Sequence, residues 1–134
     1  MEKTLFQKII DREIPADIVY EDDVCVGFLD ISPVKKGHTL LVSKNPYPWV
    51  QDVPDEELSH MIIVSKKIIF GMKESIHADY VQVGIVGTEI PHFHIHLIPH
   101  KNTDPVATSH NRPIDSYKDT EEQRSFRDAI KNSL

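Results

Sequence analysis

The sequence predicts an α+β domain with a mainly antiparallel, five-stranded sheet, one long helix and short helices near the two chain ends. Three observations predict this class. Short apolar runs alternate with polar turns, a single long stretch has helical periodicity, and the connections between apolar runs resemble hairpins. A length of 134 residues with 40% hydrophobic composition suits one domain with one core.

A short helix is expected near the N-terminus. Thr4 and Gln7 have the Thr-x-x-Gln spacing of a capping box. The apolar residues that follow Thr4 recur at helical intervals, and we expect the helix to end near Asp11.

Three strands are expected before the long helix. Residues 18–20 and 24–29 flank the polar residues 21–23, and this pattern predicts a hairpin. After a connection marked by proline and glycine, residues 38–43 are predicted to form the third strand.

The long helix is expected at about residues 54–73. Pro54 and the acidic residues after it suit a helix N-terminus. A stripe at helical spacing follows, made of Leu58, Met61, Ile62, Ser65, Ile69 and Met72. This stripe faces either the core or a second subunit.

Two strands and a terminal helix complete the predicted fold. Residues 80–86 and 92–98 predict strands on either side of a turn at residues 87–89. Residues 101–119 have the composition of irregular surface chain. A second Thr-x-x-Gln pattern predicts a short helix at about residues 120–131.

The whole chain, residues 1–134, is expected to form a single domain with residues 101–134 as a C-terminal extension. A net charge of -6 disfavours binding to nucleic acid, and no apolar stretch approaches the ~18 residues of a membrane span. Cys25 is the only cysteine, so an internal disulfide and a cluster of thiolate ligands are excluded. Because the N-terminus also lacks a leader pattern, we expect a cytoplasmic protein.

Three histidines alternate with apolar residues in one predicted strand. His92, His94 and His96 share one face, because side chains alternate along a strand. A polar strand face that happens to be histidine is one interpretation. Three histidines in register favour chemistry instead, because imidazole is the side chain that titrates near neutral pH.

A metal site is the second interpretation. Imidazoles are common zinc ligands, but the backbones of His92 and His96 would lie roughly 13 Å apart along a strand. A site made of two neighbouring histidines with His38 or Glu89 stays open. The third interpretation is a histidine nucleophile that attacks phosphorus, with flanking imidazoles that orient it, donate to phosphate oxygens and deliver a proton to the leaving group.

The histidine run resembles the signature of the histidine triad (HIT) nucleotide-binding proteins, and the similarity extends over roughly residues 4–99. The motifs that carry it include Glu13-Ile14-Pro15-Ala16, Tyr20-Glu21-Asp22-Asp23, Phe28-Leu29-Asp30-Ile31-Ser32-Pro33 and His92-Phe93-His94-Ile95-His96-Leu97-Ile98. The resemblance implies a HIT-like fold closest to the phosphoramidase-like branch.

The resemblance also assigns roles to the histidines. His94 is the expected nucleophile, His96 lies beside the phosphate and the leaving group, and His92 orients the site. His38, which opens the third strand, supports the nucleophile by hydrogen bonding. Since the third triad position is His96 and not glutamine, the resemblance favours hydrolysis over nucleotidyl transfer.

The remaining site residues follow from the same resemblance. Asp30 would bind the ribose hydroxyls, and the loop before the triad would approach the phosphate. The expected base-binding residues are Phe6, Ile9, Ile14, Phe28 and Ile31, and the loop residues are Gly87, Glu89 and Ile90. Glu89 stands where the family has a small hydroxyl side chain, and its carboxylate would raise the pKa of a neighbouring histidine.

The expected function is hydrolysis at the α-phosphate of nucleoside phosphoramidates or related dinucleotides through a covalent nucleotidyl-histidine intermediate. The alternative is a purine-nucleotide-binding regulator with little turnover. Zinc-containing family members carry Cys-x-x-Cys near the N-terminus. In this sequence Gln7 stands where one of these cysteines often occurs, so we expect no metal and no cofactor. The expected partners are a purine nucleotide such as AMP and a second copy of the chain in a homodimer.

Overall fold

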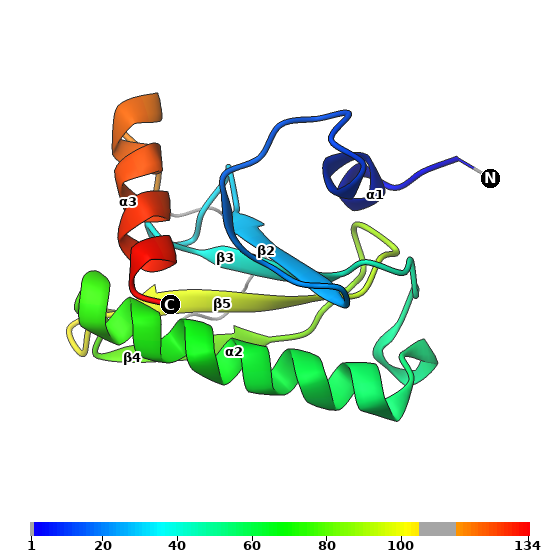
Figure 1. Cartoon of the computed structure of the whole chain (residues 1–134). Helices are drawn as coiled ribbons and strands as arrows, with labels where there is room; N and C mark the ends of the chain where they lie inside the picture. The colour runs from blue at the N-terminus through cyan, green and yellow to red at the C-terminus, as the bar shows by residue number, and fades with distance from the viewer. Residues whose placement is uncertain (1, 105–114) are drawn as a thin grey trace.

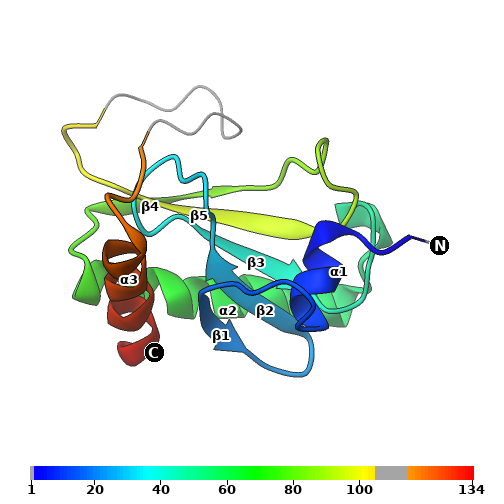
Figure 2. The same ribbon diagram turned by 90° about the horizontal axis from the view of Figure 1, so that it is seen from above.

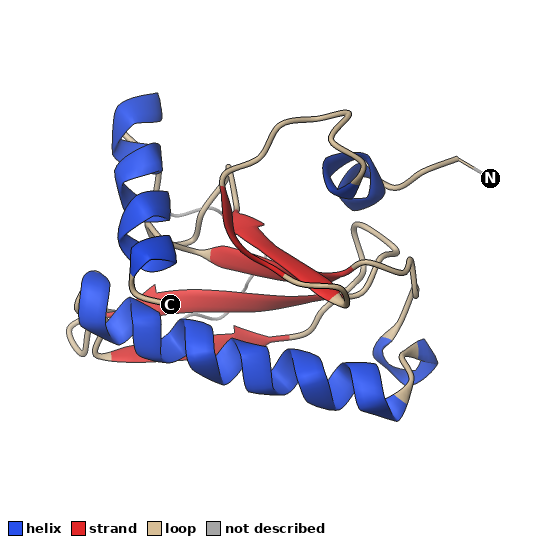
Figure 3. Cartoon of the chain, in the orientation of Figure 1, coloured by secondary structure: helices blue, strands red, loops and turns tan. Residues whose placement is uncertain are grey.

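The computed structural model describes residues 2–104 and 115–134 and confirms the predicted α+β fold. One antiparallel sheet has five strands in the order β1-β2-β3-β5-β4 (Figure 1). The strands are β1 (Ile18–Glu21), β2 (Cys25–Leu29), β3 (Thr39–Ser43), β4 (Tyr80–Gly84) and β5 (His94–His100). The helices are α1 (Leu5–Ile10), the short 3-10 helix η1 (Val50–Asp52), α2 (Asp55–Ser75) and α3 (Thr120–Asn132) (Figure 3).

The sheet separates two apolar clusters. On one face, buried side chains of α2 such as Met61 and Ile68 pack in the same cluster as Leu41 and Ile95 of the sheet. On the other face, α1 packs through Phe6 and Ile9 on Phe28, Leu40 and Val42. Figure 2 shows α1 at one end of the sheet and α3 at the other. The histidine-bearing face of β5 is therefore the α1 face.

The register of β3 and β5 places the histidines on that face. Val42 pairs with His94 and Leu40 pairs with His96. Paired residues of an antiparallel ladder project to the same side. Val42 and Leu40 both belong to the α1-side cluster, so His94 and His96 project beside α1.

The predicted turn between the last two strands is longer than expected. β4 ends at Gly84 and β5 begins at His94, so residues 85–93 form a loop and His92 lies outside the strand. Pro91 lacks a backbone N–H, which disfavours a ladder hydrogen bond there. The N–H of Phe93 donates to the carbonyl of Tyr47 at 2.6 Å instead of joining the strand ladder.

The helices lie where the sequence predicts them, but their capping residues and buried faces differ from the prediction. Thr4 caps α1 by accepting from the N–H of Gln7 at 3.0 Å, but the Gln7 side chain donates to Asp11 and does not close a capping box. In α2 the buried stripe runs through Met61, Val64, Ser65, Ile68 and Met72, whereas Ile62 is 46% exposed. Asp119 caps α3, one residue before the threonine of the predicted Thr-x-x-Gln pattern, and the sequence did not predict η1. Among the described residues, no helix is long and apolar enough to cross a membrane.

Candidate active site

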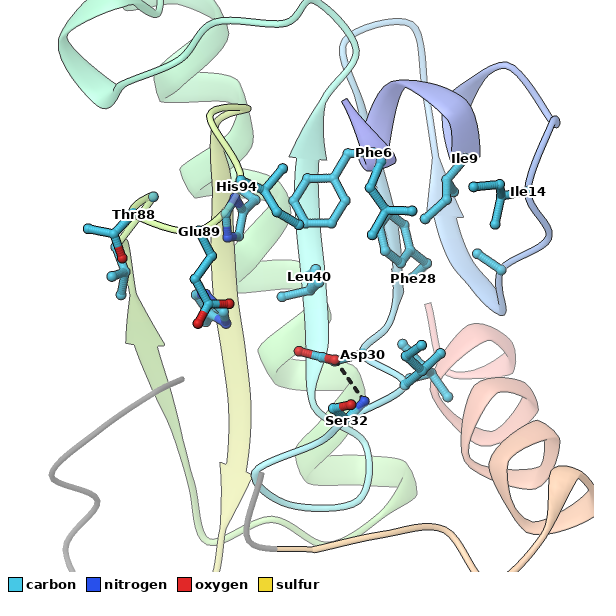
Figure 4. A pocket seen from close by; sticks show the side chains of 18 of the residues that line it. Phe6, Ile9, Ile14, Phe28, Asp30, Ser32, Leu40, Thr88, Glu89 and His94 are labelled. Atoms are coloured by element: carbon cyan, nitrogen blue, oxygen red, sulfur yellow. Dashed lines mark hydrogen bonds between the residues drawn. The ribbon is translucent and has the colours of Figure 1, made fainter. Parts of the chain in front are cut away.

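A cavity of about 290 Å³ lies between α1 and the α1 face of the sheet. The loop after β2 and the loop between β4 and β5 complete its rim (Figure 4). The structure brings most of the predicted site residues into its lining: Phe6, Ile9, Ile14, Phe28, Asp30, Ile31, Gly87, Glu89, Ile90, His94 and His96. His38 and His92 do not line the cavity and are buried behind it, at 1% and 0% exposure.

His94 presents one ring nitrogen as a base. Its Nδ1 lies 2.7 Å from the carbonyl oxygen of His92, which can only accept, so Nδ1 carries the hydrogen and donates. The neutral ring then keeps its lone pair on Nε2. Burial lowers the pKa of His94 although the hydrogen bond to His92 and the charge of Glu89 raise it. His94 is therefore a neutral imidazole at physiological pH.

In the neutral forms of His38 and His96, a hydrogen-bonded chain determines which ring nitrogen carries the hydrogen. The backbone N–H of Val34 donates to Nδ1 of His38 at 3.1 Å, so this nitrogen has no hydrogen. The hydrogen of neutral His38 therefore lies on Nε2, which donates to Nδ1 of His96 across 3.0 Å. Neutral His96 in turn carries its hydrogen on Nε2. The chain thus makes His96 a hydrogen-bond donor from Nε2.

His92 connects His94 to α1. Its Nε2 donates to the carbonyl of Ser43 at 2.6 Å, which leaves Nδ1 to accept from the hydroxyl of Thr4 at 2.7 Å. Burial lowers the pKa of His92 and keeps the ring neutral. The same residue supplies the carbonyl that orients His94. His92 is therefore a positioning residue.

Asp30 lies at the end of β2 on the cavity wall. Its Oδ1 accepts from the N–H of Ser32 at 2.9 Å, and its Oδ2 lies 3.8 Å from Nε2 of His38. Burial raises the pKa of Asp30, the Ser32 hydrogen bond opposes this shift, and the charge of Glu89 adds to it. A partly desolvated carboxylate of this kind gains from a hydroxyl donor in the cavity.

One half of the cavity is apolar. Figure 4 shows Phe6, Ile9, Ile14 and Phe28 on one side of His94, opposite Thr88 and Glu89. Phe6 contacts the His94 ring edge-to-face, with centroids 4.8 Å apart. The flat, apolar walls suit an aromatic base.

Sequence reasoning missed several lining residues. They are Leu5, Pro15, Ala16, Leu29, Ser32, Leu40, Val86 and Thr88. Alternation along β3 could have found Leu40, because it pairs with His96 and shares its face. Nothing in the sequence pattern indicates that Val86 and Thr88 line the cavity, since the path of their loop depends on tertiary contacts.

The loop between β4 and β5 brings backbone and charge to the cavity. Gly87 has a φ of +82°, a backbone conformation that favours glycine at this position. Glu89 is exposed, but its carboxylate points into the space between His94 and Asp30 (Figure 4).

Two clusters of the described residues have the composition of metal ligands. In the cavity wall, donor atoms of Asp30, His38 and His96 lie within 4.8 Å of one another. The hydrogen bonds described above leave His38 no lone pair for a metal, since Nδ1 accepts from Val34 and Nε2 donates. Hydrogen bonding, not coordination, accounts for this cluster.

The second cluster lies at the turn between β1 and β2, where donor atoms of Asp22, Cys25 and His60 are close together. The Asp22 carboxylate already accepts from the N–H groups of Val24 and Cys25 at 2.7 and 2.9 Å and lies 2.6 Å from Nε2 of His60. Burial raises the pKa of the Cys25 thiol to about 12, so the thiol stays protonated. These contacts stabilise the turn.

Comparisons with known proteins identify the family and the fold of the chain. The HIT domain matches residues 11–103. Purine nucleoside phosphoramidase of Escherichia coli (strain K12) is 39% identical over 113 residues, which are 78% of this chain and 93% of that protein. An uncharacterized HIT-like protein of Methanocaldococcus jannaschii is 41% identical over 104 residues, 75% of this chain and 81% of that protein. The crystal structure of a HIT-like protein involved in cell-cycle regulation from Bartonella henselae has a TM-score of 0.85 and 28% identity, over 98% of this chain and 96% of that chain.

Proposed function

This chain belongs to the HIT domain family, and from that membership we propose that it hydrolyses nucleoside phosphoramidates through a covalent intermediate on His94. One observation carries the proposal: Nδ1 of His94 donates to a backbone carbonyl, so Nε2 of a neutral ring keeps its lone pair at the cavity. A neutral imidazole with a fixed tautomer is suited to attack phosphorus. The similarity to purine nucleoside phosphoramidase supports the same chemistry.

The reaction proceeds in two displacements. First, Nε2 of His94 forms a bond to the α-phosphorus while the P–N bond breaks, and the leaving nitrogen takes up a proton and departs as the amine. Second, water attacks the phosphorus and releases a proton to solvent, the bond to Nε2 breaks, and a nucleoside monophosphate leaves with His94 neutral again. Nδ1 of His94 keeps its hydrogen throughout, and the His92 carbonyl stabilises the positive charge that the ring carries in the intermediate.

His96 acts in this scheme as a hydrogen-bond donor. Because its Nδ1 accepts from His38, the hydrogen on Nε2 belongs to a neutral ring, and loss of this hydrogen would leave an anionic imidazolate. Donation to a phosphate oxygen or to the leaving nitrogen is the role that this state allows. The proton that the departing amine gains comes from solvent.

The nucleoside occupies the apolar half of the cavity. Phe6, Ile9 and Phe28 would contact the base, and Asp30 would accept from the ribose hydroxyls. A purine nucleotide such as AMP fits this division between apolar walls and one carboxylate, and the name of the E. coli relative supports a purine.

The test is turnover of adenosine 5′-phosphoramidate, followed by mass spectrometry of protein quenched during turnover. We expect release of AMP and a protein species that carries one adenylyl group on the peptide containing His94. A purine-nucleotide-binding regulator, the alternative function, would bind AMP and show neither product nor adduct. That result would exclude the hydrolase.

We further propose that residues 101–134 are a C-terminal extension of a single domain. Ile130 of α3 is fully buried in the same cluster as the α2 side chains. Arg127 and Gln123 also bind Asp17, at 3.0 and 2.5 Å. The cytoplasmic location stays a prediction from the sequence.

A further inference from the structure

The cavity has an unusual charge for a site that binds a phosphate. Two carboxylates, Asp30 and Glu89, line it, and none of the described lining residues is lysine or arginine. Glu89 also makes no ion pair with any residue in the described ranges. A phosphate in this cavity therefore meets histidine and backbone donors together with uncompensated negative charge.

Glu89 lies on the side of the cavity where the leaving group of the substrate would extend. In Figure 4, Glu89 and Thr88 lie on one side of His94, and Phe6, Ile9 and Phe28 lie on the other. If the nucleoside occupies the apolar side, the group attached beyond the α-phosphate extends toward Glu89. An electrostatic effect of Glu89 on both His94 and Asp30 agrees with a central place for its carboxylate at the cavity mouth.

We propose that Glu89 makes this site selective for nucleoside phosphoramidates whose leaving amine carries an additional positive charge. The proposal rests on the hydrolase function proposed above and names its substrate class. A carboxylate near the departing group attracts an ammonium and repels a phosphate or carboxylate. The site thus disfavours dinucleoside polyphosphates, whose leaving groups are anionic.

The same charge favours the breaking of the P–N bond. The leaving nitrogen gains a proton as it departs, so positive charge develops on the side of the phosphorus opposite His94. Glu89 stabilises this developing charge, whereas a leaving phosphate would develop negative charge there. Because Glu89 is exposed and screened by water, we expect an effect of about tenfold and not of several orders of magnitude.

Three adenosine 5′-phosphoramidates test the proposal. Their amines are ethylenediamine, propylamine and β-alanine, so the arm ends in an ammonium, a methyl group or a carboxylate while the P–N bond stays the same. We expect kcat/KM of the parent protein to fall in that order, with about tenfold between the two charged arms. Assays contain EDTA, which prevents divalent cations from neutralising the carboxylates.

Glu89→Gln gives the decisive comparison, because intrinsic differences between the amines act equally on both proteins. We expect this variant to reduce the spread between the charged arms to about twofold, and added salt to reduce it in the parent but not in the variant. Glu56→Gln is the matched control: it removes the same charge from an exposed site in the first turn of α2 and should keep the parent order. Melting temperatures of both variants confirm that they are folded.

The outcomes separate the two proposals. Turnover of all three compounds with the same spread in the parent and in Glu89→Gln would overturn the selectivity while the hydrolase function stands. Failure of the parent protein to turn over any of the three would overturn the hydrolase function itself.

Discussion

At the scale of single residues, the site depends on where each imidazole carries its hydrogen. The backbone determines these tautomers. His92 and His94 each lie beside a carbonyl, which can only accept, and His38 lies beside the Val34 N–H, which can only donate. The spacing of the histidines predicts that they meet on one face, but it does not contain these backbone partners. The sequence therefore predicts the residue types of the site and not the state of each ring.

His94→Ala is expected to abolish turnover while nucleotide binding persists. The variant removes the atom that bonds to phosphorus, but the apolar walls and Asp30 that hold the nucleoside stay in place. We expect turnover of adenosine 5′-phosphoramidate to fall by at least about a thousandfold and the Kd of AMP to change by less than about tenfold. Steady-state kinetics and isothermal titration calorimetry measure the two quantities, and unchanged turnover would contradict the assignment of the nucleophile.

The pH dependence of kcat/KM follows from the direction of the His94 pKa. Burial lowers this pKa below its ordinary value of 6.5, and the nucleophile acts only when it is neutral. Activity should therefore persist below pH 6.5 and decline at lower pH, where the ring takes up a proton. Burial also lowers the pKa of His92, so protonation of this ring is likewise shifted to lower pH.

Glu89→Gln should move the decline of kcat/KM at acid pH to still lower pH. The charge of Glu89 raises the pKa of His94, and its loss leaves burial less opposed. The sequence had suggested that Glu89 would raise the pKa of a neighbouring histidine, and the direction agrees, although burial outweighs it. An acid limb in Glu89→Gln that coincides with the parent would show that the carboxylate has no electrostatic effect on the nucleophile.

At the scale of elements, local patterns predicted the strands and helices, and tertiary contacts decided their ends. The alternation of residues 92–98 suggested a strand that begins at His92, but ladder pairing with β3 begins at His94. The backbone of Phe93 is held by Tyr47, a residue of the segment that leads into η1. A partner so distant in sequence cannot be found from periodicity, which is also why the lining residues Val86 and Thr88 were missed.

Thr4 links an element to the site, and its hydroxyl is expected to stabilise both. It accepts from the N–H of Gln7 as the cap of α1 and donates to Nδ1 of His92. Thr4→Val removes both hydrogen bonds at nearly constant volume, so we expect the free energy of unfolding to fall by about 1–3 kcal/mol. Urea denaturation measures the change. Thr4→Ser keeps the hydroxyl and serves as control, and equal stability of the two variants would refute the dual role.

At the scale of the whole molecule, the sheet divides the chain into a core side and a chemical side. Alternation predicted this division, because Ile95 and Leu97 of β5 pack in the cluster with α2, whereas His94 and His96 lie on the α1 face. The sequence also left the apolar stripe of the long helix either to the core or to a subunit contact. The structure places Met61, Ile68 and Met72 of that helix in the core and leaves Ile63 and Phe70 exposed at 67% and 62%.

Helix α2, which carries these exposed side chains, contacts an edge strand of the sheet. β4 is the last strand in the order of the described sheet, and α2 contacts it. Val81 of β4 packs on the core, whereas Val83 on the same face is 48% exposed. A two-fold symmetric contact between two copies would cover the outer side of α2 and the β4 edge together. We therefore propose that the homodimer expected from the family resemblance uses this surface.

Phe70→Glu tests that interface. Ile63 and Phe70 are seven residues apart, so they share one side of α2, and a carboxylate among apolar side chains of the partner would be left without a counter-charge. We expect the parent to have the mass of a dimer by light scattering at micromolar concentration and Phe70→Glu to have the mass of a monomer. Ser125→Glu adds the same charge to an exposed position of α3, away from the proposed contact, and should stay dimeric. A monomeric parent would refute the homodimer, and a dimeric Phe70→Glu would place its interface elsewhere on the molecule.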